Sequence, residues 1–313
     1  MRVVSAAEID RLLDYPGLID AIGEAFAGAT IAPARHHHRI ARPGAEATLL
    51  LMPAWHDDDA GFAGVKVVTV FPGNAAHAKP SVMGTYLLLA GDTGEPLAAL
   101  DGVALTLRRT AATSAFASRH LSRPDASRLV MIGAGALAPH LIAAHAAVRP
   151  IRKVTVWNRT ADTARRLAAS LDRDGLSVSA TDDLEGAVGD ADIVSAATMT
   201  RAPLIHGAWL GPGTHVDLVG AYTPEMREAD DEAIRRARVF VDTRSGMKES
   251  GDIAEPLASG ALTEAGIAGD LHDLGRATRP GRRSPDEITL FKSVGNAIED
   301  LAAAVQVWRR LNG

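Results

Sequence analysis

The sequence contains no cysteine among its 313 residues. Disulfide frameworks, thiolate zinc sites and cysteine nucleophiles all require thiols, so these three kinds of chemistry are excluded. Catalysis by this chain has to come from histidine, lysine, arginine, carboxylates, hydroxyls or a bound cofactor. The absence of disulfides fits a reducing compartment, and we expect the protein in the cytoplasm.

Aromatic residues, basic blocks and long apolar runs are also scarce. Aromatic residues make up 4% of the chain, and 33 Lys+Arg oppose 38 Asp+Glu for a net charge of -5. Nucleic-acid binding needs basic patches with stacking side chains, so we exclude that class. No run reaches the ~18 apolar residues of a membrane span, and residues 1–10 carry acids where a secretory signal is basic. We expect no membrane association.

The first hundred residues predict two helices followed by an antiparallel sheet. Ser5 and Glu8 form a capping-box pattern before the first helix, and Pro16 begins a second helix. Short β-rich runs separated by turns then predict strands. These runs are Ala47–Met52, Gly64–Val70, Val82–Leu89 and Pro96–Leu100. Asp101 is placed to cap a long helix over residues 103–121.

After Pro124 strands alternate with helices, which predicts an α/β fold with a parallel sheet and crossover helices. The predicted strands are Arg128–Ile132, Lys153–Trp157, Leu176–Ala180, Asp192–Ala197, His215–Val219, Val239–Asp242 and Glu287–Lys292. A last helix, from about Asn296 to Leu311, has apolar spacing suited to packing back onto the first domain. The Pro/Gly/Arg-rich run Arg276–Pro285 is predicted to be a linker.

A glycine turn points to a dinucleotide cofactor. Gly133-Ala134-Gly135-Ala136-Leu137-Ala138 stands between a predicted strand and a helix, where Gly133 permits the turn and Gly135 lets a pyrophosphate approach the backbone. The next strand ends in Trp157-Asn158-Arg159-Thr160, without the acid that binds an NAD ribose. Arg159 favours NADPH as the cofactor, and NADH stays possible. Alternatively, Arg159 is a solvated arginine at a helix start.

Seven motifs occur in one order along nearly the whole chain. They are Met52-Pro53-Ala54, Gly64-Val65-Lys66-Val67-Val68, Arg108-Arg109-Thr110-Ala111-Ala112, the glycine turn, Trp157-Asn158-Arg159-Thr160, Lys248-Glu249-Ser250-Gly251-Asp252 and Phe291-Lys292-Ser293-Val294-Gly295. Together they resemble the ornithine cyclodeaminase/μ-crystallin family, and most of all its cyclic ketimine reductases. The resemblance implies a Rossmann NAD(P)-binding domain over 120–288. It implies an α+β substrate-binding and dimerisation domain over 1–119 and 289–313, and a homodimer.

The resemblance also implies a cationic clamp for a substrate carboxylate. Lys66 and Arg109 match the family motifs, and Arg35 falls near a family arginine, with Arg39 as its competitor. A guanidinium fork suits a planar carboxylate. Ser81 aligns with a hydroxyl near the substrate, so Lys66, Arg109 and Ser81 are the expected catalytic residues. Taken singly, Lys66 could instead be an edge-strand lysine and Arg109 a helix-surface residue.

Further cofactor contacts follow from the same resemblance. Thr110 aligns with a cofactor-phosphate contact, and Ser293 with Val294 resembles the loop that returns to the nicotinamide. Thr198 and Met199 stand at the end of a predicted parallel strand, where an α/β sheet receives its ligand, although core packing is the alternative there.

One departure from the family bears on the reaction. Cyclodeaminases place an aspartate two residues after the glycine of the strand end, whereas this chain has Gly220-Ala221-Tyr222. Without that acid, ammonia expulsion lacks its proton-handling group, and Tyr222 is expected to bind substrate or only to pack. We therefore predict reduction of Δ1-pyrroline-2-carboxylate or Δ1-piperideine-2-carboxylate to L-proline or L-pipecolate, with Lys66 or water as proton donor.

Two other kinds of activity stay open. Ornithine cyclodeamination and alanine or imino-acid dehydrogenation are enzymatic alternatives, and a non-catalytic protein that binds NADPH and a small ligand is another. We expect no metal site. In a strand only His36 and His38 of the run His36-His37-His38 would share a face, and His56–Asp59 has the composition of an acidic surface loop.

Overall fold

The chain divides into two units. The computed structural model describes residues 1–42, 46–57, 61–173 and 175–313. One unit, here called the terminal unit, comprises Met1–Thr110 with Asn296–Gly313. The other, the central unit, comprises Ala111–Gly295.

The terminal unit contains a seven-stranded sheet in the order β1-β7-β6-β5-β4-β2, with β3 also pairing with β4. Its strands are β1 Arg2–Val4, β2 Thr30–Ile31, β3 His36–Ile40, β4 Ala47–His56, β5 Phe62–Val70, β6 Val82–Ala90 and β7 Pro96–Asp101. Neighbours from β4 to β7 are antiparallel, as predicted, whereas β1 joins β7 in parallel. A 3-10 turn, η1 Pro72–His77, lies between β5 and β6.

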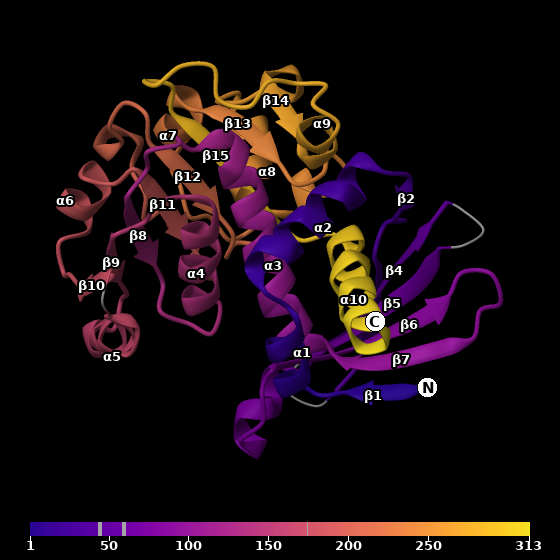
Figure 1. Cartoon of the computed structure of the whole chain (residues 1–313). Coiled ribbons are helices and arrows are strands. Elements are labelled where there is room, and N and C mark those ends of the chain that lie inside the picture. The colour runs from indigo at the N-terminus through magenta and orange to yellow at the C-terminus, as the bar shows by residue number, and fades with distance from the viewer. Residues whose placement is uncertain (43–45, 58–60, 174) are drawn as a thin grey trace. The chain divides into compact units, whose positions relative to one another are not determined.

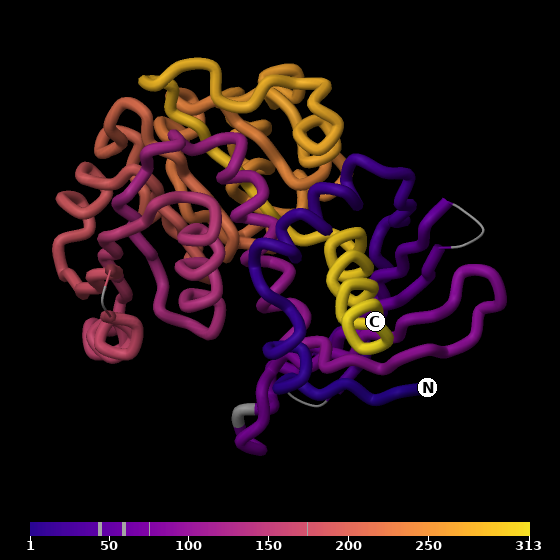
Figure 2. The backbone as a smooth tube through the Cα atoms, in the orientation of Figure 1, coloured from indigo at the N-terminus to yellow at the C-terminus, as the bar shows by residue number. Residues whose placement is uncertain are grey.

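Among the described residues, three helices lie wholly within the terminal unit: α1 Ala6–Leu12, α2 Tyr15–Ala27 and α10 Ala297–Asn312. The capping box of Ser5 and Glu8 begins α1, and α2 begins with a proline in its first turn, both as predicted. Helix α10 packs beside α2 and against β4, β5 and β6, so the predicted docking of the last helix is confirmed (Figure 1). Both chain ends therefore belong to this unit (Figure 2).

The border between the units falls inside a continuous helix, α3 Gly102–Leu121. Asp101 caps it, because its Oδ1 accepts hydrogen bonds from the backbone N–H groups of Val103 and Ala104 at 3.0 and 2.9 Å. The sequence placed the borders at 119/120 and 288/289, and the structure places them at 110/111 and 295/296. A helix without a breaker carries no border signal, and β15 Thr289–Lys292 belongs to the central sheet.

The central unit contains eight parallel strands in the order β10-β9-β8-β11-β12-β15-β13-β14. The remaining strands are β8 Arg128–Ile132, β9 Lys153–Trp157, β10 Ser177–Ala180, β11 Ile193–Ala196, β12 His215–Leu218, β13 Arg238–Val241 and β14 Ile267–Asp270. Seven of the eight match predicted runs, and β14 was not predicted. The predicted Rossmann fold class is confirmed. The strand order reverses between β8 and β11, which is where such sheets receive ligands.

Helices connect these strands. They are α4 Ala138–Val148, α5 Ala161–Leu171, α6 Leu184–Gly189, α7 Asp231–Arg236, α8 Gly251–Ser259 and α9 Leu271–Gly275, with 3-10 turns η2 Gly207–Trp209, η3 Met247–Glu249 and η4 Glu264–Gly266. Alternate residues such as Val130, Ile132, Val216 and Leu218 pack into one hydrophobic core. No described helix has the length and apolarity needed to cross a membrane.

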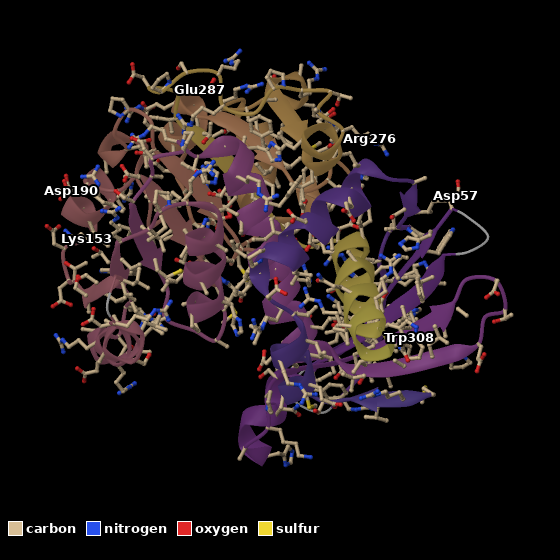
Figure 3. All side chains as sticks on the ribbon, in the orientation of Figure 1. Asp57, Lys153, Asp190, Arg276, Glu287 and Trp308 are labelled. Atoms are coloured by element: carbon tan, nitrogen blue, oxygen red, sulfur yellow. The ribbon has the colours of Figure 1, made fainter. Side chains whose placement is uncertain are left out.

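The run Arg276–Pro285 is not a linker between units. It joins α9 to β15 within the central unit, and Figure 3 shows Arg276 and Glu287 near the two ends of this connection. Arg282 fastens it, because its guanidinium donates to the carbonyls of Leu121 at 2.8 Å and Gly213 at 3.0 Å. Its Pro/Gly/Arg composition resembles a linker, but the hydrogen bonds of the half-buried Arg282 guanidinium set its conformation.

Candidate functional site

Lys66 and Arg109 come together inside the terminal unit through acids on α10. Lys66 Nζ lies 2.9 Å from Asp300 Oδ1 and 2.8 Å from Oδ2. Arg109 Nε lies 2.9 Å from Asp300 Oδ1, and Arg109 Nη1 pairs with Glu299 Oε2. We call Lys66, Arg109, Glu299 and Asp300 the cation–acid cluster.

The cluster is buried, which excludes the two structural alternatives for its cations. Lys66 is 3% exposed and stands on β5, a strand paired on both sides, so it is not an edge-strand lysine. Arg109 is 5% exposed and is not a helix-surface residue. Ions removed from water in this way are retained only with counter-charges, and the two cations face two acids.

Burial gives the two cations different acid strengths. Loss of hydration and the neighbouring Arg109 together lower the pKa of Lys66 to about 8, although Asp300 opposes the fall. Burial also disfavours the charge of Arg109, but Asp300 and Glu299 outweigh it and raise the pKa of Arg109 above its ordinary value. At neutral pH Arg109 is a permanent cation, whereas Lys66 can exchange a proton.

The sequence analysis missed both acids of the cluster. Asn296 caps α10 and its backbone N–H donates to Glu299 Oε1 at 3.0 Å, so Glu299 closes the helix end as well as pairing with Arg109. The available signal was two acids in the first turn of a helix that is otherwise apolar there, from Ala297 to Leu301. Acids in that position usually face solvent and favour the helix dipole.

The other expected substrate residues of the terminal unit lie nearer the surface. Arg35 is half-buried, directly before β3, and Arg39 within β3 pairs with Glu46 at 3.5 Å with its side chain 82% exposed. Ser81 is exposed directly before β6. Thr110, expected at a cofactor phosphate, is buried at the last residue of this unit.

The histidine run lies on β3. The rings of His36 and His38 meet edge to face with centroids 6.5 Å apart, so these two share one side of the strand as predicted. Residues Asp58 and Asp59 of the acidic loop lie outside the described residues. In the described part of the chain, no three His, Cys, Asp or Glu side chains gather in a group able to hold a metal ion.

A cavity of about 430 Å³ opens at the glycine turn of the central unit. It is lined by Gly133, Ala134, Gly135, Trp157, Asn158, Arg159, Thr160, Ala197, Thr198, Met199, Thr200 and Leu204. Gly133 has φ +101°, and a Cβ there would lie 2.6 Å from the carbonyl oxygen of Ala197. A Cβ on Gly135 would meet nothing within 4 Å, so its backbone faces open space. This arrangement fits a dinucleotide pyrophosphate.

Seven of the expected cofactor residues line this cavity, namely Gly133, Gly135, Asn158, Arg159, Thr160, Thr198 and Met199, whereas Thr110, Ala136, Leu137, Ser293 and Val294 are not part of its lining. Ala136 and Leu137 lead into α4, and Asn158 holds the glycine turn by accepting from the Ala134 N–H at 3.3 Å. Asn158 also donates to the Thr160 carbonyl at 3.1 Å, while Arg159 is exposed. Met199 is 71% exposed although it is apolar, which fits a wall of an open ligand cavity.

Buried acids brace the carboxyl ends of the neighbouring strands. Asp242 Oδ2 accepts from the backbone N–H groups of Val294 and Gly295 at 2.7 and 2.8 Å, which orders the loop of Ser293 and Val294. Lys292 at the end of β15 pairs with Asp252 at 2.9 Å, and its Nζ lies 3.8 Å from Glu228 Oε2. The sequence analysis missed these acids too.

Tyr222 stands at the position where the family resemblance places the aspartate of cyclodeaminases. It follows β12 and is 47% exposed. Glu228, six residues on, is wholly buried. Burial and the neighbouring Asp252 raise its pKa to about 7, although the charge of Lys292 opposes the rise. Its oxygens accept backbone hydrogen bonds, so it does not replace the aspartate that the family resemblance places in cyclodeaminases.

Known proteins share this architecture. The chain is 44% identical to the Δ1-pyrroline-2-carboxylate reductase of Paracoccus denitrificans over 268 residues, covering 85% of this chain and 84% of that protein. The structure of the Thermococcus litoralis Δ1-pyrroline-2-carboxylate reductase with NADH and L-proline is similar with a TM-score of 0.93 at 32% identity, covering 100% and 98% of the two chains. An archaeal alanine dehydrogenase dimer with bound NAD has a TM-score of 0.92 at 28% identity, covering 100% and 96%.

The family model matches without a gap in coverage. The model of the ornithine cyclodeaminase/mu-crystallin family extends over residues 1–313. The resemblance drawn from the seven motifs is thereby confirmed, and this chain belongs to the ornithine cyclodeaminase/mu-crystallin family.

Proposed function

We propose that this protein is an NAD(P)H-dependent reductase of cyclic ketimine carboxylates. Its substrates are Δ1-pyrroline-2-carboxylate and Δ1-piperideine-2-carboxylate, and its products are L-proline and L-pipecolate. The observation that carries the proposal is the buried pair Lys66 and Arg109, held by one acid, in a chain that also has a dinucleotide cavity. The relatives named for reduction of the five-membered ketimine support the same substrate class.

In this proposal the cation–acid cluster binds and orients the substrate. Arg109 presents a planar guanidinium that grips the carboxylate, with Arg35 as a third cation, and Tyr222 and Ser81 contact the ring. Fixing the carboxylate fixes the imine carbon, and such positioning supplies much of the rate. When bound, the reduced nicotinamide supplies a hydride to that carbon.

Lys66 is the proposed proton donor. The hydride forms the new C–H bond, the C=N π electrons move to nitrogen, and one proton from Lys66 Nζ balances the product amine. A lysine with its pKa near 8 is protonated at neutral pH yet able to release its proton. Asp300 holds the ammonium group in place for that transfer.

A substrate panel tests the proposal. Wild-type protein is expected to oxidise NADPH with each cyclic ketimine, and Lys66→Gln and Arg109→Ala are expected to lower kcat/KM by about 10²–10⁴-fold. Lys79→Ala, on the exposed loop before β6, is the matched control and keeps wild-type rates. Dinucleotide affinity, measured separately, shows that the variants are folded. Turnover of L-ornithine without turnover of either ketimine would contradict the proposal.

NADPH is the proposed preferred cofactor, with NADH as a second donor. No acid stands at the end of β9, and the exposed Arg159 is available to a ribose 2′-phosphate. Arg159→Ala is expected to weaken NADPH binding about tenfold and leave NADH binding unchanged. Arg166→Ala, exposed on α5, is the control. Tighter NADH than NADPH binding by wild-type protein would overturn the preference.

We also propose a cytoplasmic homodimer. The similar alanine dehydrogenase is described as a dimer, and the exposed apolar residues Val82 and Met83 of β6 fit a contact through the sheet of the terminal unit. Light scattering is expected to give twice the chain mass, and Met83→Glu is expected to lower it.

A further inference from the structure

Two turns at the carboxyl edge of the central sheet are packed backbone against backbone. Thr198 lies in the turn after β11, and Gly220 lies in the turn after β12. A Cβ on Gly220 would collide with the backbone of Thr198, so only glycine allows this approach. A shift of either turn therefore displaces the other.

The carboxylate of Glu228 joins these two turns. Its Oε1 accepts from the backbone N–H of Thr198 at 2.7 Å and from the Thr198 hydroxyl at 2.8 Å. Its Oε2 accepts from the backbone N–H groups of Gly220 and Ala221 at 2.8 and 3.2 Å. A wholly buried acid that accepts four such bonds holds both turns in one arrangement.

Glu228 is itself fixed by charge and by its own backbone. Asp252 Oδ1 accepts from the Glu228 N–H at 2.7 Å and from the Ala229 N–H at 3.2 Å. Lys292 pairs with Asp252 at 2.9 Å and lies near Glu228, so its positive charge faces both acids. These contacts tie the segment before α7 to the start of α8 and the end of β15.

The joined turns would face the nicotinamide half of a bound dinucleotide, which is the half that carries the hydride. The adenosine ribose lies at the end of β9 in this fold, beside residues 158–160, and the pyrophosphate lies at the glycine turn. The strand order continues on the other side of the reversal with β11 and β12. A dinucleotide that crosses the reversal therefore extends its nicotinamide half toward Thr198, Met199 and the turn that leads to Tyr222.

We propose that Glu228 is a positioning residue for the nicotinamide half of the cofactor, acting through the turns after β11 and β12. It touches neither cofactor nor substrate. The inference rests on the dinucleotide part of the proposed function and not on its ketimine substrate.

The exchange Glu228→Gln isolates this role because it keeps the size of the side chain. Glutamine has one oxygen and one NH2 group, so whichever way it turns, the NH2 faces a backbone N–H of Thr198 or those of Gly220 and Ala221. One turn loses its acceptor and meets a donor instead. Glu255→Gln is the matched control, because Glu255 on α8 makes a half-exposed ion pair with Arg227 outside the cavity.

The experiment compares the dissociation constants of NADH and of ADP-ribose, which lacks the nicotinamide. In Glu228→Gln we expect the NADH constant to rise at least about tenfold and the ADP-ribose constant to stay within about twofold; Glu255→Gln changes neither. Equal weakening of both ligands, or no change in their ratio, would overturn the inference.

A second variant and a pH series keep the test decisive if Glu228→Gln folds poorly. Thr198→Val removes only the hydroxyl donor. It is expected to raise the ratio of the NADH dissociation constant to the ADP-ribose dissociation constant, but by less than Glu228→Gln does. Because the pKa of Glu228 lies near 7, wild-type NADH affinity is expected to fall as the pH drops below 7, while ADP-ribose affinity stays level. A flat NADH profile, or an unchanged Thr198→Val ratio, would refute the role. Ketimine turnover is not needed for either readout.

Discussion

Asp300 holds Lys66 by both oxygens of one carboxylate, at 2.9 and 2.8 Å from the same ammonium nitrogen. The two residues are 234 positions apart, on β5 and α10. The same carboxylate also reaches Arg109. One acid thus sets the position of two cations and acts to raise the pKa of both.

The rate of reduction is expected to fall as the pH rises above about 8. Burial has lowered the pKa of Lys66 to about 8, so above that pH the residue has lost the proton that the product needs. The measurement is kcat/KM for ketimine reduction between pH 6 and 10 at saturating NADPH. A rate that stays level to pH 10 would exclude Lys66 as the donor.

Asp300→Asn is expected to move that alkaline limb to lower pH. The carboxylate opposes the fall in the pKa of Lys66, so an uncharged amide leaves the ammonium less stabilised. The same pH profile measures the shift, with Glu95→Gln on the exposed turn before β7 as the control. A limb at the wild-type pH in Asp300→Asn would contradict the coupling.

The two glycines of the turn are expected to respond differently to alanine. Gly133→Ala forces a side chain onto φ +101° and against the Ala197 carbonyl, so it should lower the free energy of unfolding by about 1–3 kcal/mol. Gly135→Ala meets no protein atom, so stability should change by no more than about 0.5 kcal/mol.

Dinucleotide affinity distinguishes the backbone strain of Gly133→Ala from the blocked pyrophosphate site of Gly135→Ala. Gly135→Ala should weaken NADPH binding at least about tenfold, because the added methyl group occupies the space in which the pyrophosphate approaches the backbone. Thermal unfolding and NADPH titration of both variants check the prediction. Unimpaired binding by a stable Gly135→Ala would place the pyrophosphate elsewhere.

Stability of the central unit is expected to fall as the pH drops from 6.5 toward 3. His215 on β12 is wholly buried, and loss of hydration lowers its pKa to about 3 against 6.5 in an unfolded chain. The unfolded chain binds a proton over this range and the folded one does not, so up to about 1.4 kcal/mol is lost per pH unit.

Denaturant unfolding at several pH values measures that slope. His215→Asn retains a polar group toward Thr289, its partner at 3.0 Å, and should make the slope shallower. His37→Asn, exposed on β3, should leave it unchanged. An unchanged slope in His215→Asn would assign the acid sensitivity to other groups.

Local signals in the sequence were sufficient for four strands of the terminal sheet, seven strands of the central sheet and the glycine turn, but not for β1, β2 and β3. The cap by Asp101 involves Val103 and Ala104, and the sequence displays those neighbours directly. The glycine turn was found from the spacing of Gly133 and Gly135 between a predicted strand and a predicted helix. Strand β14 was missed because Ile267–Asp270 is four residues long and contains a glycine, which weakens any strand signal.

The buried acids could not be predicted because their partners are remote in sequence. Glu299 meets Arg109 190 positions away, and Glu228 meets Thr198 30 positions away. A carboxylate usually faces water, so an acid in the sequence gives no indication that it is buried in the fold. Lys66 and Arg109 were found through family motifs, whereas the acids that hold them became apparent only from the folded contacts.

The position of α10 has a consequence for the order in which the protein is made. Residues 111–295, the whole central unit, are synthesised before residue 296 is added. The first 110 residues emerge earliest, yet they lack Glu299 and Asp300 until synthesis reaches the last helix. Until then the cation–acid cluster is incomplete, so the cavity at the glycine turn can form before that cluster does.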